Sequence, residues 1–200
     1  MENKTKVLLL SNNDNANVLA ERLGGVDCDV KLFHDKITVE LVKELDPDIV
    51  VSYNYSHIVK EDVIDFLGNK IINMHVSFLP WNKGASPNIW SFIDDTPKGV
   101  TIHRLEKGLD TGKIIVQREV GFDEDKDTLS SSYQRLQEEI VDLLMENWNY
   151  IKDGNYELKE QVGSGSYHRT ADLNKILGNQ HIDYNMTIAE FKTFIKRLMT

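Results

Sequence analysis

Two polar side chains, Asn73 and His75, stand two positions apart at the end of an apolar stretch. Side chains alternate across a strand, so both point to the same face of a sheet and an amide lies beside an imidazole. In open α/β sheets, ligands bind beyond the carboxyl ends of the strands, which is where this pair falls. The pair could therefore bind a substrate and transfer protons. The alternative is that it only bonds the backbone of the following loop.

A carboxylate and a polar loop are the next candidates. Asp110 lies between Gly108 and Gly112, and glycine on both sides permits tight backbone geometry and close approach of a ligand. By itself this is also an ordinary Asp-containing turn. The loop over residues 76–88 is dense in hydrogen-bond donors and reaches Pro87, which suits the first turn of a helix. Because ordering such a loop costs entropy, we expect it to bind a ligand.

The first part of the chain supplies the elements that would position these residues. Apolar runs of strand length are each followed by apolar residues at helical spacing. This alternation predicts an α/β fold, Rossmann-like, with a mostly parallel sheet flanked by helices. We expect strands over residues 6–11, 28–33, 49–51 and 70–74, and helices over residues 16–23, 38–45 and 61–67.

The second part of the chain departs from that alternation. The apolar stretches at residues 99–105 and 113–120 are too close together for a crossover helix, so we expect antiparallel pairing there. Apolar residues then recur three and four apart over residues 128–153, which predicts one long amphipathic helix. This helix should lie along the sheet.

The C-terminal part of the chain predicts a smaller unit. A capping-box pattern from Thr187 to Glu190 heads a helix that we expect over residues 188–199. We expect a catalytic domain over residues 1–155 and a C-terminal appendage over residues 156–200, too small for an independent core.

Composition excludes several classes of function. The 23 Lys and Arg against 32 Asp and Glu give a net charge of −9, which disfavours a nucleic-acid partner. The longest apolar run is residues 7–10, far below the roughly 18 residues of a membrane span, so we expect no membrane partner and a cytoplasmic protein. Cys28 lies between two aspartates and is not expected to be a nucleophile. The scattered histidines show no metal-ligand spacing, and we expect no metal.

Three short motifs follow one another in a fixed order, and they are Asn73-x-His75-x-Ser77-x-Leu79-Pro80 with Gly84, Gly99-Val100-Thr101-Ile102-His103, and Leu109-Asp110-Thr111-Gly112. In this order and spacing they resemble the N10-formyltetrahydrofolate-dependent formyltransferase family. The resemblance spans residues 73–117, while residues 1–72 agree only in the pattern of strands and helices. It implies the formyltransferase fold and a catalytic set of Asn73, His75 and Asp110.

The chemistry that this resemblance implies is acyl transfer from N10-formyltetrahydrofolate to an amine. Asn73 and His75 would donate to the oxyanion of the tetrahedral intermediate. Asp110 would orient His75, favour its charged form or accept the proton of the amine, and the sequence does not choose among these roles. By resemblance, the folate would be bound by Tyr53, Tyr55, Ser56, His57, Ile58, Leu105 and Gly108. The loop over residues 53–58 would act largely through backbone groups, and its aromatic side chains could equally belong to the core.

Within the family, the chain looks most like the sugar-nucleotide N-formyltransferases of surface-polysaccharide pathways, such as those of lipopolysaccharide and O-antigen. The residues that carry this likeness are 79–90, 96–103 and Tyr167-His168-Arg169. The tRNA-directed members add a C-terminal β-barrel for which the length leaves no room, and folate hydrolases add an N-terminal domain. The purine enzyme, glycinamide ribonucleotide formyltransferase, normally has a glycine-rich phosphate turn where this chain has residues 12–15 without glycine. The residues expected to bind the nucleotide-linked amino sugar are Asn12, Asn13, Trp81, Asn82, Lys83, Gly84 and Arg169.

Two other functions remain open. One is glycinamide ribonucleotide formyltransferase itself, and the other is a noncatalytic module that senses a folate or a nucleotide. A sensor would not need Asn73, His75 and Asp110 together, which favours the enzyme. A homodimer is possible, and the amino sugar and its nucleotide base are left open.

Overall fold

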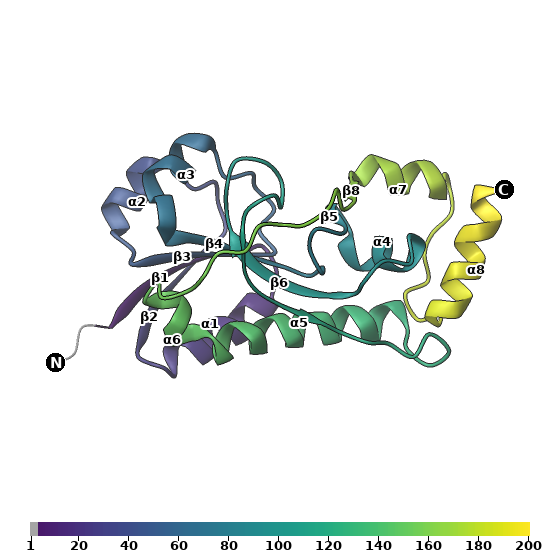
Figure 1. Cartoon of the computed structure of the whole chain (residues 1–200), viewed down its shortest axis with the longest axis horizontal. Coiled ribbons are helices and arrows are strands. Elements are labelled where there is room, and N and C mark those ends of the chain that lie inside the picture. The colour runs from purple at the N-terminus through teal and green to yellow at the C-terminus, as the bar shows by residue number, and fades with distance from the viewer. Residues whose placement is uncertain (1–3) are drawn as a thin grey trace.

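The computed structural model describes residues 4–200, and a six-stranded mixed sheet lies at its centre (Figure 1). The strand order is β2-β1-β3-β4-β6-β7. These strands are β1 (Thr5–Leu10), β2 (Cys28–Phe33), β3 (Ile49–Tyr53), β4 (Ile71–His75), β6 (Gly99–Arg104) and β7 (Ile114–Glu119). The helices are α1 (Asn15–Gly24), α2 (Val39–Leu45), α3 (Glu61–Leu67), α4 (Pro87–Ile93), α5 (Leu129–Glu146), α6 (Trp148–Lys152), α7 (Thr170–Leu177) and α8 (Ile188–Met199).

The pairing of the strands changes along the sheet. β1 pairs in parallel with β2 and β3, and β3 pairs in parallel with β4. β6 is antiparallel to both β4 and β7. The connection from β6 to β7, residues 105–113, is too short for a crossover helix, whereas the one from β4 to β6 contains α4. The prediction of a mostly parallel sheet flanked by helices, with an antiparallel part in the second half of the chain, is confirmed.

Helices cover both faces of the sheet (Figure 1). α1, α5 and α6 lie on one face, where Leu19 and Leu144 belong to the same apolar cluster as Leu9 of β1. α2 and α3 lie on the other, where Val42 packs in a second cluster with Leu8. Consecutive residues of one strand thus enter opposite cores, which explains why the strand reads as a continuous apolar run. Among residues 4–200, every helix is too short or too polar to cross a membrane.

The prediction of one helix over residues 128–153 is wrong, because the structure has two. Asn147 leaves helical geometry, at φ −106° and ψ 8°, and its side-chain amide donates to the Leu143 carbonyl oxygen at 2.8 Å. Asparagine competes with the helix for backbone hydrogen bonds, which explains a break at this position. The apolar spacing continues across the break at Leu144 and Trp148, so periodicity alone could not reveal it.

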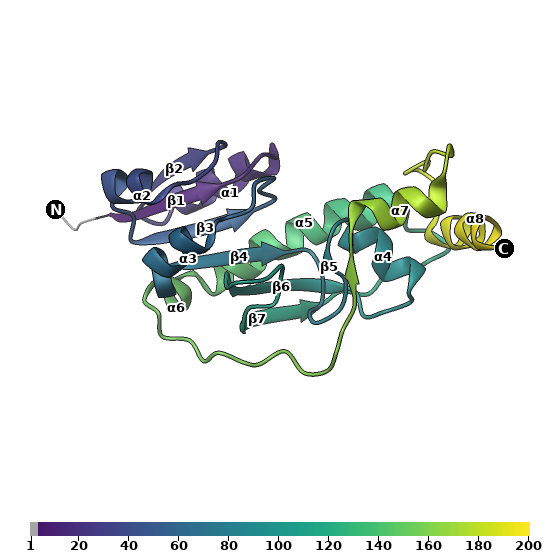
Figure 2. The ribbon, with the colours of Figure 1, turned by 90° about the horizontal axis from the view of Figure 1, so that it is seen from above.

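The chain returns along the sheet after α6 (Figure 2). Lys159 forms an isolated antiparallel bridge with Ile114 of β7. Two short strands, β5 (Lys83–Gly84) and β8 (Tyr167–His168), then pair in parallel. These two strands were not predicted, because a two-residue strand carries no periodicity.

The last two helices complete a third apolar cluster. α8 begins at the predicted Thr187 capping box, whereas α7 was not predicted. Leu173 of α7 and Phe191 of α8 share this cluster with Phe92 of α4 and Leu129 of α5. The C-terminal helices therefore pack on elements of the expected catalytic domain, and the division after residue 155 stays a prediction.

Replacing Phe191 with Ala should destabilise the whole chain. Phe191 is fully buried, and Phe→Ala in a core costs about 3–5 kcal/mol through lost burial and a residual cavity. Urea unfolding, followed by circular dichroism, measures the free energy of unfolding. Lys196→Ala, on the exposed face of α8, is the control. A loss below about 1 kcal/mol would show that the C-terminal helices do not support the core.

Candidate active site

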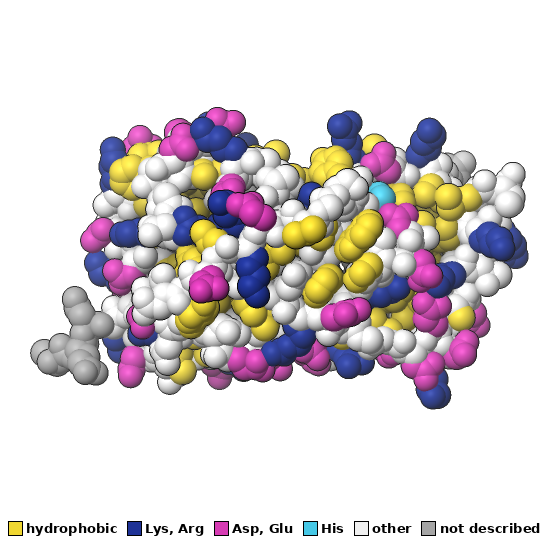
Figure 3. Space-filling view, in the orientation of Figure 1, with side chains coloured by type: hydrophobic (Ala, Val, Ile, Leu, Met, Phe, Trp, Pro, Cys, Tyr) yellow, Lys and Arg dark blue, Asp and Glu magenta, His cyan; other side chains and the backbone are white. Residues whose placement is uncertain are grey.

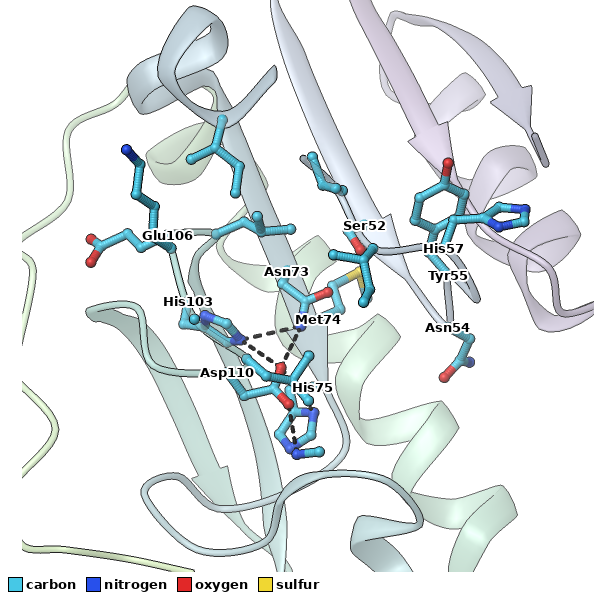
Figure 4. Close-up of a pocket in the computed structure, with 18 of the residues that line it drawn as sticks. Ser52, Asn54, Tyr55, His57, Asn73, Met74, His75, His103, Glu106 and Asp110 are labelled. Atoms are coloured by element: carbon cyan, nitrogen blue, oxygen red, sulfur yellow. Dashed lines mark hydrogen bonds and ion pairs between the residues drawn. The ribbon is translucent and has the colours of Figure 1, made fainter. Parts of the chain in front are cut away.

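A cavity of about 800 Å³ opens beside the carboxyl ends of β3 and β4 (Figure 4). The loops after β3, β4 and β6 enclose it. Its walls include these residues predicted for the site: Tyr55, Ser56, His57, Ile58, Asn73, His75, Gly84, Leu105, Gly108 and Asp110. Loops at strand ends are thus brought together from three parts of the sequence.

The pairing of β4 with β6 creates the polar end of the cavity. Asn73 of β4 lies directly opposite His103 of β6, and its Nδ2 is 3.2 Å from His103 Nε2. The same Nδ2 donates to Asp110 Oδ1 at 3.3 Å. Both hydrogens of the Asn73 amide therefore have acceptors, and its oxygen points away from Asp110 and His103 (Figure 4).

Asp110 is the centre of this polar cluster. Its backbone is left-handed, with φ +52°, and its side chain is only 9% exposed. Oδ2 accepts the Gly84 N–H at 2.9 Å, while Oδ1 lies 3.7 Å from His75 Nδ1 and 3.6 Å from His103 Nε2. One carboxylate thus touches residues of β4, β5 and β6.

The hydrogen bonds of the two imidazoles assign their protons. His103 Nδ1 lies 2.7 Å from the Arg104 carbonyl oxygen, so it carries the hydrogen and leaves Nε2 to accept from Asn73. His75 Nε2 lies 3.2 Å from the Asn82 carbonyl oxygen and likewise donates. His75 Nδ1 then faces Asp110 without a hydrogen bond, since 3.7 Å is too long for one.

Burial and neighbouring charges shift the pKa values of His75 and Asp110 from their usual ranges. Burial lowers the pKa of His75, and His103 lowers it further, while the Asp110 carboxylate raises it in part. Burial alone would raise the pKa of Asp110, but His75, His103 and the Gly84 N–H outweigh it and hold that pKa below its usual range. The cluster therefore presents a carboxylate beside a neutral imidazole that can take up a proton.

A formyl transferase family model matches residues 3–147, which include Asn73, His75, His103 and Asp110. The chain belongs to the formyl transferase family. The expected resemblance is confirmed.

The similar proteins include formyltransferases that act on sugars and formyltransferases that act on tRNA. The dTDP-4-amino-4,6-dideoxyglucose formyltransferase of Mycobacterium tuberculosis is 30% identical over 204 residues, covering 96% of this chain and 84% of the relative. A methionyl-tRNA formyltransferase of Clostridioides difficile is also 30% identical, but over 81% of this chain and 52% of its own length. The crystal structure of the formyltransferase PseJ from Anoxybacillus kamchatkensis, in complex with UDP-4,6-dideoxy-4-formamido-L-AltNAc and tetrahydrofolate, superposes with a TM-score of 0.85. It is 39% identical, with 93% of this chain and 97% of that chain covered.

Two residues predicted to contact substrates lie elsewhere in this formyl transferase. Tyr53 is fully buried on the face of the sheet that α5 covers, and its hydroxyl donates to Gln137 of α5, so its side chain does not reach the cavity. Asn82 is also fully buried, and its amide donates to Thr96 Oγ1 at 2.8 Å. Both polar groups already have partners in the protein. Tyr53 is thus a core residue, the alternative that the sequence left open, and the prediction that the Asn82 side chain contacts the acceptor is corrected.

Other predicted acceptor residues lie around the cavity without lining it. Asn12 Oδ1 accepts from the backbone and hydroxyl of Ser56, both at 2.9 Å, so it holds the folate-side loop in place. Asn13 donates to the Tyr133 hydroxyl at 3.4 Å. Trp81, Lys83 and Arg169 stand outside the cavity wall, the first two only partly buried and Arg169 exposed.

Several residues that line the cavity were not predicted for the site, among them His103 and Tyr167. His103 and Thr101 lie two positions apart on one face of β6, as Asn73 and His75 do on β4. Only the register of β4 and β6 shows that His103 faces Asn73. Tyr167 lines the cavity from β8, and its half-exposed ring packs over Gly84. Among residues 4–200, no three His, Cys, Asp or Glu side chains are grouped so as to hold a metal ion.

The lowered pKa of His75 should be visible in the pH dependence of stability. The unfolded chain protonates this residue at about 6.5, whereas the folded chain does so only at lower pH. Folding therefore becomes less favourable as the pH falls below about 6.5, by at most about 1.4 kcal/mol per pH unit, until the folded pKa is passed. We expect this loss in the wild type relative to His75→Gln, measured by urea unfolding between pH 7.5 and 5. Parallel stability profiles for the two proteins would show that burial does not lower this pKa.

Proposed function

We propose that this chain transfers the formyl group of N10-formyltetrahydrofolate to the amine of a nucleotide-linked amino sugar. The observation that carries the proposal is the cluster of Asn73, His75 and ionised Asp110 at the end of a cavity of about 800 Å³. A 39% identical formyltransferase of nearly the same length binds tetrahydrofolate and a 4-formamido sugar nucleotide. The geometry of the polar cluster and the similarity to this formyltransferase thus support the same reaction, sugar N-formylation.

The cavity fits the folate on its outer side. Ile58, Leu105 and Leu109 give apolar walls for a flat ring system, and Ile58 and Leu109 remain 87% and 50% exposed. Such half-open apolar surface beside a few polar groups is typical of sites for cofactors. The loop from Tyr55 to Ile58 lines this side of the cavity, and we assign its backbone groups to the folate, apart from the Ser56 N–H, which donates to Asn12 Oδ1.

Protein groups supply the proton transfers and the charge balance of acyl transfer. When bound, the folate supplies the formyl group, whose carbon the acceptor amine attacks. Neutral His75 takes up the proton that the amine loses, and the ionised Asp110 beside it stabilises the resulting imidazolium. The bond between the formyl carbon and N10 of the folate would then break, and His75 can return the proton to N10. Both amide hydrogens of Asn73 are directed at His103 and Asp110, so the prediction that this amide donates to the oxyanion does not fit the geometry. Its oxygen instead accepts a hydrogen bond from the attacking amine, and the protonated His75 is left as the predicted donor to the oxyanion.

The acceptor occupies the side of the cavity next to β8. Tyr167 offers an aromatic face there, and the Arg169 guanidinium carbon lies 6.0 Å from the centre of its ring. An aromatic face suits a sugar or a base, and an arginine suits a pyrophosphate. Lys83 and Trp81 remain candidates for the outer rim of this side, whereas Asn82 shapes the loop from inside.

The structure disfavours glycinamide ribonucleotide as the acceptor. In the turn after β1, Asn12 bonds Ser56 and the His34 carbonyl oxygen, while Asn13 bonds Tyr133 and caps its own turn. This turn is tied to the protein and has no glycine through which a phosphate could approach the backbone. A sensor module, the noncatalytic alternative, would not require a buried carboxylate beside two imidazoles.

The proposal also covers the compartment, the pathway and the oligomeric state. We place the reaction in the cytoplasm, in the synthesis of a surface polysaccharide such as the O-antigen of lipopolysaccharide, and we propose a homodimer as the working assembly. The support is the likeness to sugar N-formyltransferases. The net charge of −9 supports the further expectation that the acceptor is not a nucleic acid.

A panel of acceptors tests the proposed function. The protein should consume N10-formyltetrahydrofolate with at least one amino sugar linked to dTDP, GDP or UDP, and not with glycinamide ribonucleotide. Release of tetrahydrofolate and the mass of the formylated product measure the transfer. Turnover of glycinamide ribonucleotide with every amino sugar refused would establish the purine enzyme instead.

Three substitutions test the catalytic roles: Asn73→Ala, His75→Ala and Asp110→Ala. Each should lower kcat by roughly 10² or more, because each removes proton transfer or transition-state stabilisation. The folded state should persist, as judged by circular dichroism. Asn69→Ala is the matched control, since Asn69 is an exposed amide just before β4. Turnover near that of the wild type in folded His75→Ala would exclude the proposed acid–base role.

A further inference from the structure

A side chain from the C-terminal segment reaches the loop that carries Asp110. Gln161 lies between α6 and β8, beyond the residues 3–147 that the family model matches. Its Nε2 donates to the backbone carbonyl oxygen of Asp110 at 2.8 Å and to that of Gly112 at 2.8 Å. The two hydrogens of one amide thus bind the catalytic loop on both sides of Thr111.

The Asp110 loop needs such support from outside. Asp110 itself is left-handed, at φ +52°, and Gly108 has φ +102°. A Cβ on Gly112 would lie 1.8 Å from the Arg104 carbonyl oxygen, so the backbone is packed tightly there. Left-handed backbone at a residue other than glycine persists only where its surroundings hold it. Within the loop, the side chain of Thr111 supplies one bond, to the Lys107 carbonyl oxygen at 3.1 Å.

The segment that carries Gln161 is anchored on both sides of it. Before it, Lys159 exchanges two backbone hydrogen bonds with Ile114, at 2.8 and 2.9 Å. After it, the Ser166 carbonyl oxygen accepts the Lys83 N–H at 3.0 Å, next to the Gly84 N–H that binds the Asp110 carboxylate. One segment therefore supports both the loop that carries the carboxylate and the strand that binds it.

We propose that Gln161 is a positioning residue for catalysis, which holds the Asp110 carboxylate at its distances from Asn73, His75 and the Gly84 N–H. The inference rests on the proposed function, because it gives Asp110 a role in formyl transfer. Among residues 4–200, the side-chain hydrogen bonds of Gln161 go to backbone oxygens, so it acts through the geometry of Asp110. The Oε1 atom of Gln161 is buried without a partner, and the amide is thus held by the two bonds of its nitrogen.

The test replaces Gln161 with Met, which keeps the length of the side chain and its charge but removes both donors. We expect kcat with the amino-sugar acceptor to fall roughly tenfold or more, since small displacements of catalytic groups have large effects on rate. KM for both substrates should change less than threefold. Glu160→Gln is the matched control, because the neighbouring Glu160 is exposed and pairs only with Lys113. The control should keep kcat within twofold of the wild type.

A double substitution separates positioning from general damage. In an Asp110→Ala background, Gln161→Met should lower kcat no further, because the carboxylate on which Gln161 acts is gone. A second loss of the same size in that background would overturn the proposal. Wild-type kcat in the folded Gln161→Met protein would overturn it as well.

A measurement without substrates keeps this test separate from that of the function. The charged and titratable groups facing His75 are Asp110 and His103, and the Asp110 carboxylate raises the pKa of His75. Titration of the His75 imidazole by NMR should give a lower pKa in Asp110→Asn, and a smaller decrease in Gln161→Met. Unchanged titration in Gln161→Met would overturn the positioning role. Absence of formyl transfer by the wild type with every acceptor would instead overturn the proposed function, and the NMR result would still decide where the carboxylate lies.

Discussion

The buried Asp110 carboxylate is the constraint on which the rest of the site depends. Removing an ion from water is costly unless hydrogen bonds and neighbouring dipoles replace the lost solvent. Here the Gly84 N–H and the Asn73 amide replace it, and His103 lies 3.6 Å away. These three partners come from β5, β4 and β6. A carboxylate can therefore be ionised at this place only when the central strands and the loop after β4 are assembled together.

This arrangement also explains why a neutral imidazole and a carboxylate coexist. Each of the two groups is buried, and burial alone would favour a neutral form for both. The difference lies in their hydrogen bonds, because the Asp110 oxygens meet two donors, whereas His75 has a backbone carbonyl on Nε2 and no hydrogen-bonded partner on Nδ1. A proton arriving at Nδ1 would face the carboxylate at once. The site is thus arranged for the charge that develops during transfer.

The sequence predicted what depends on local pattern, and it missed what depends on register and on distant segments. Periodicity placed Asn73 and His75 on one face, and the capping box at Thr187 marked the start of α8. The pairing of His103 with Asn73 depends on β6 lying beside β4, which no local pattern encodes. Tyr53 was predicted to belong to the loop that binds the folate, but its side chain points to the opposite side of the strand from the cavity. It is the last residue of β3 and faces α5, whereas Asn54 and Tyr55 after it line the cavity.

The close contact between β5 and β8 links the acceptor side to the catalytic cluster through backbone alone. Gly84 has φ +90°, and a Cβ there would lie 2.3 Å from the His168 carbonyl oxygen, so only glycine lets β8 approach this closely. The approach turns the Gly84 N–H towards Asp110 and brings the Tyr167 ring over the same residue. A displacement of β8 would therefore move the aromatic wall of the acceptor side and the donor that binds the catalytic carboxylate at the same time. On the face drawn in Figure 3, exposed hydrophobic side chains lie among Lys, Arg, Asp and Glu side chains. With the proposed function, substrate recognition and chemistry would share this one backbone contact, and the segment that runs from α6 to β8 would be part of the active site (Figure 2).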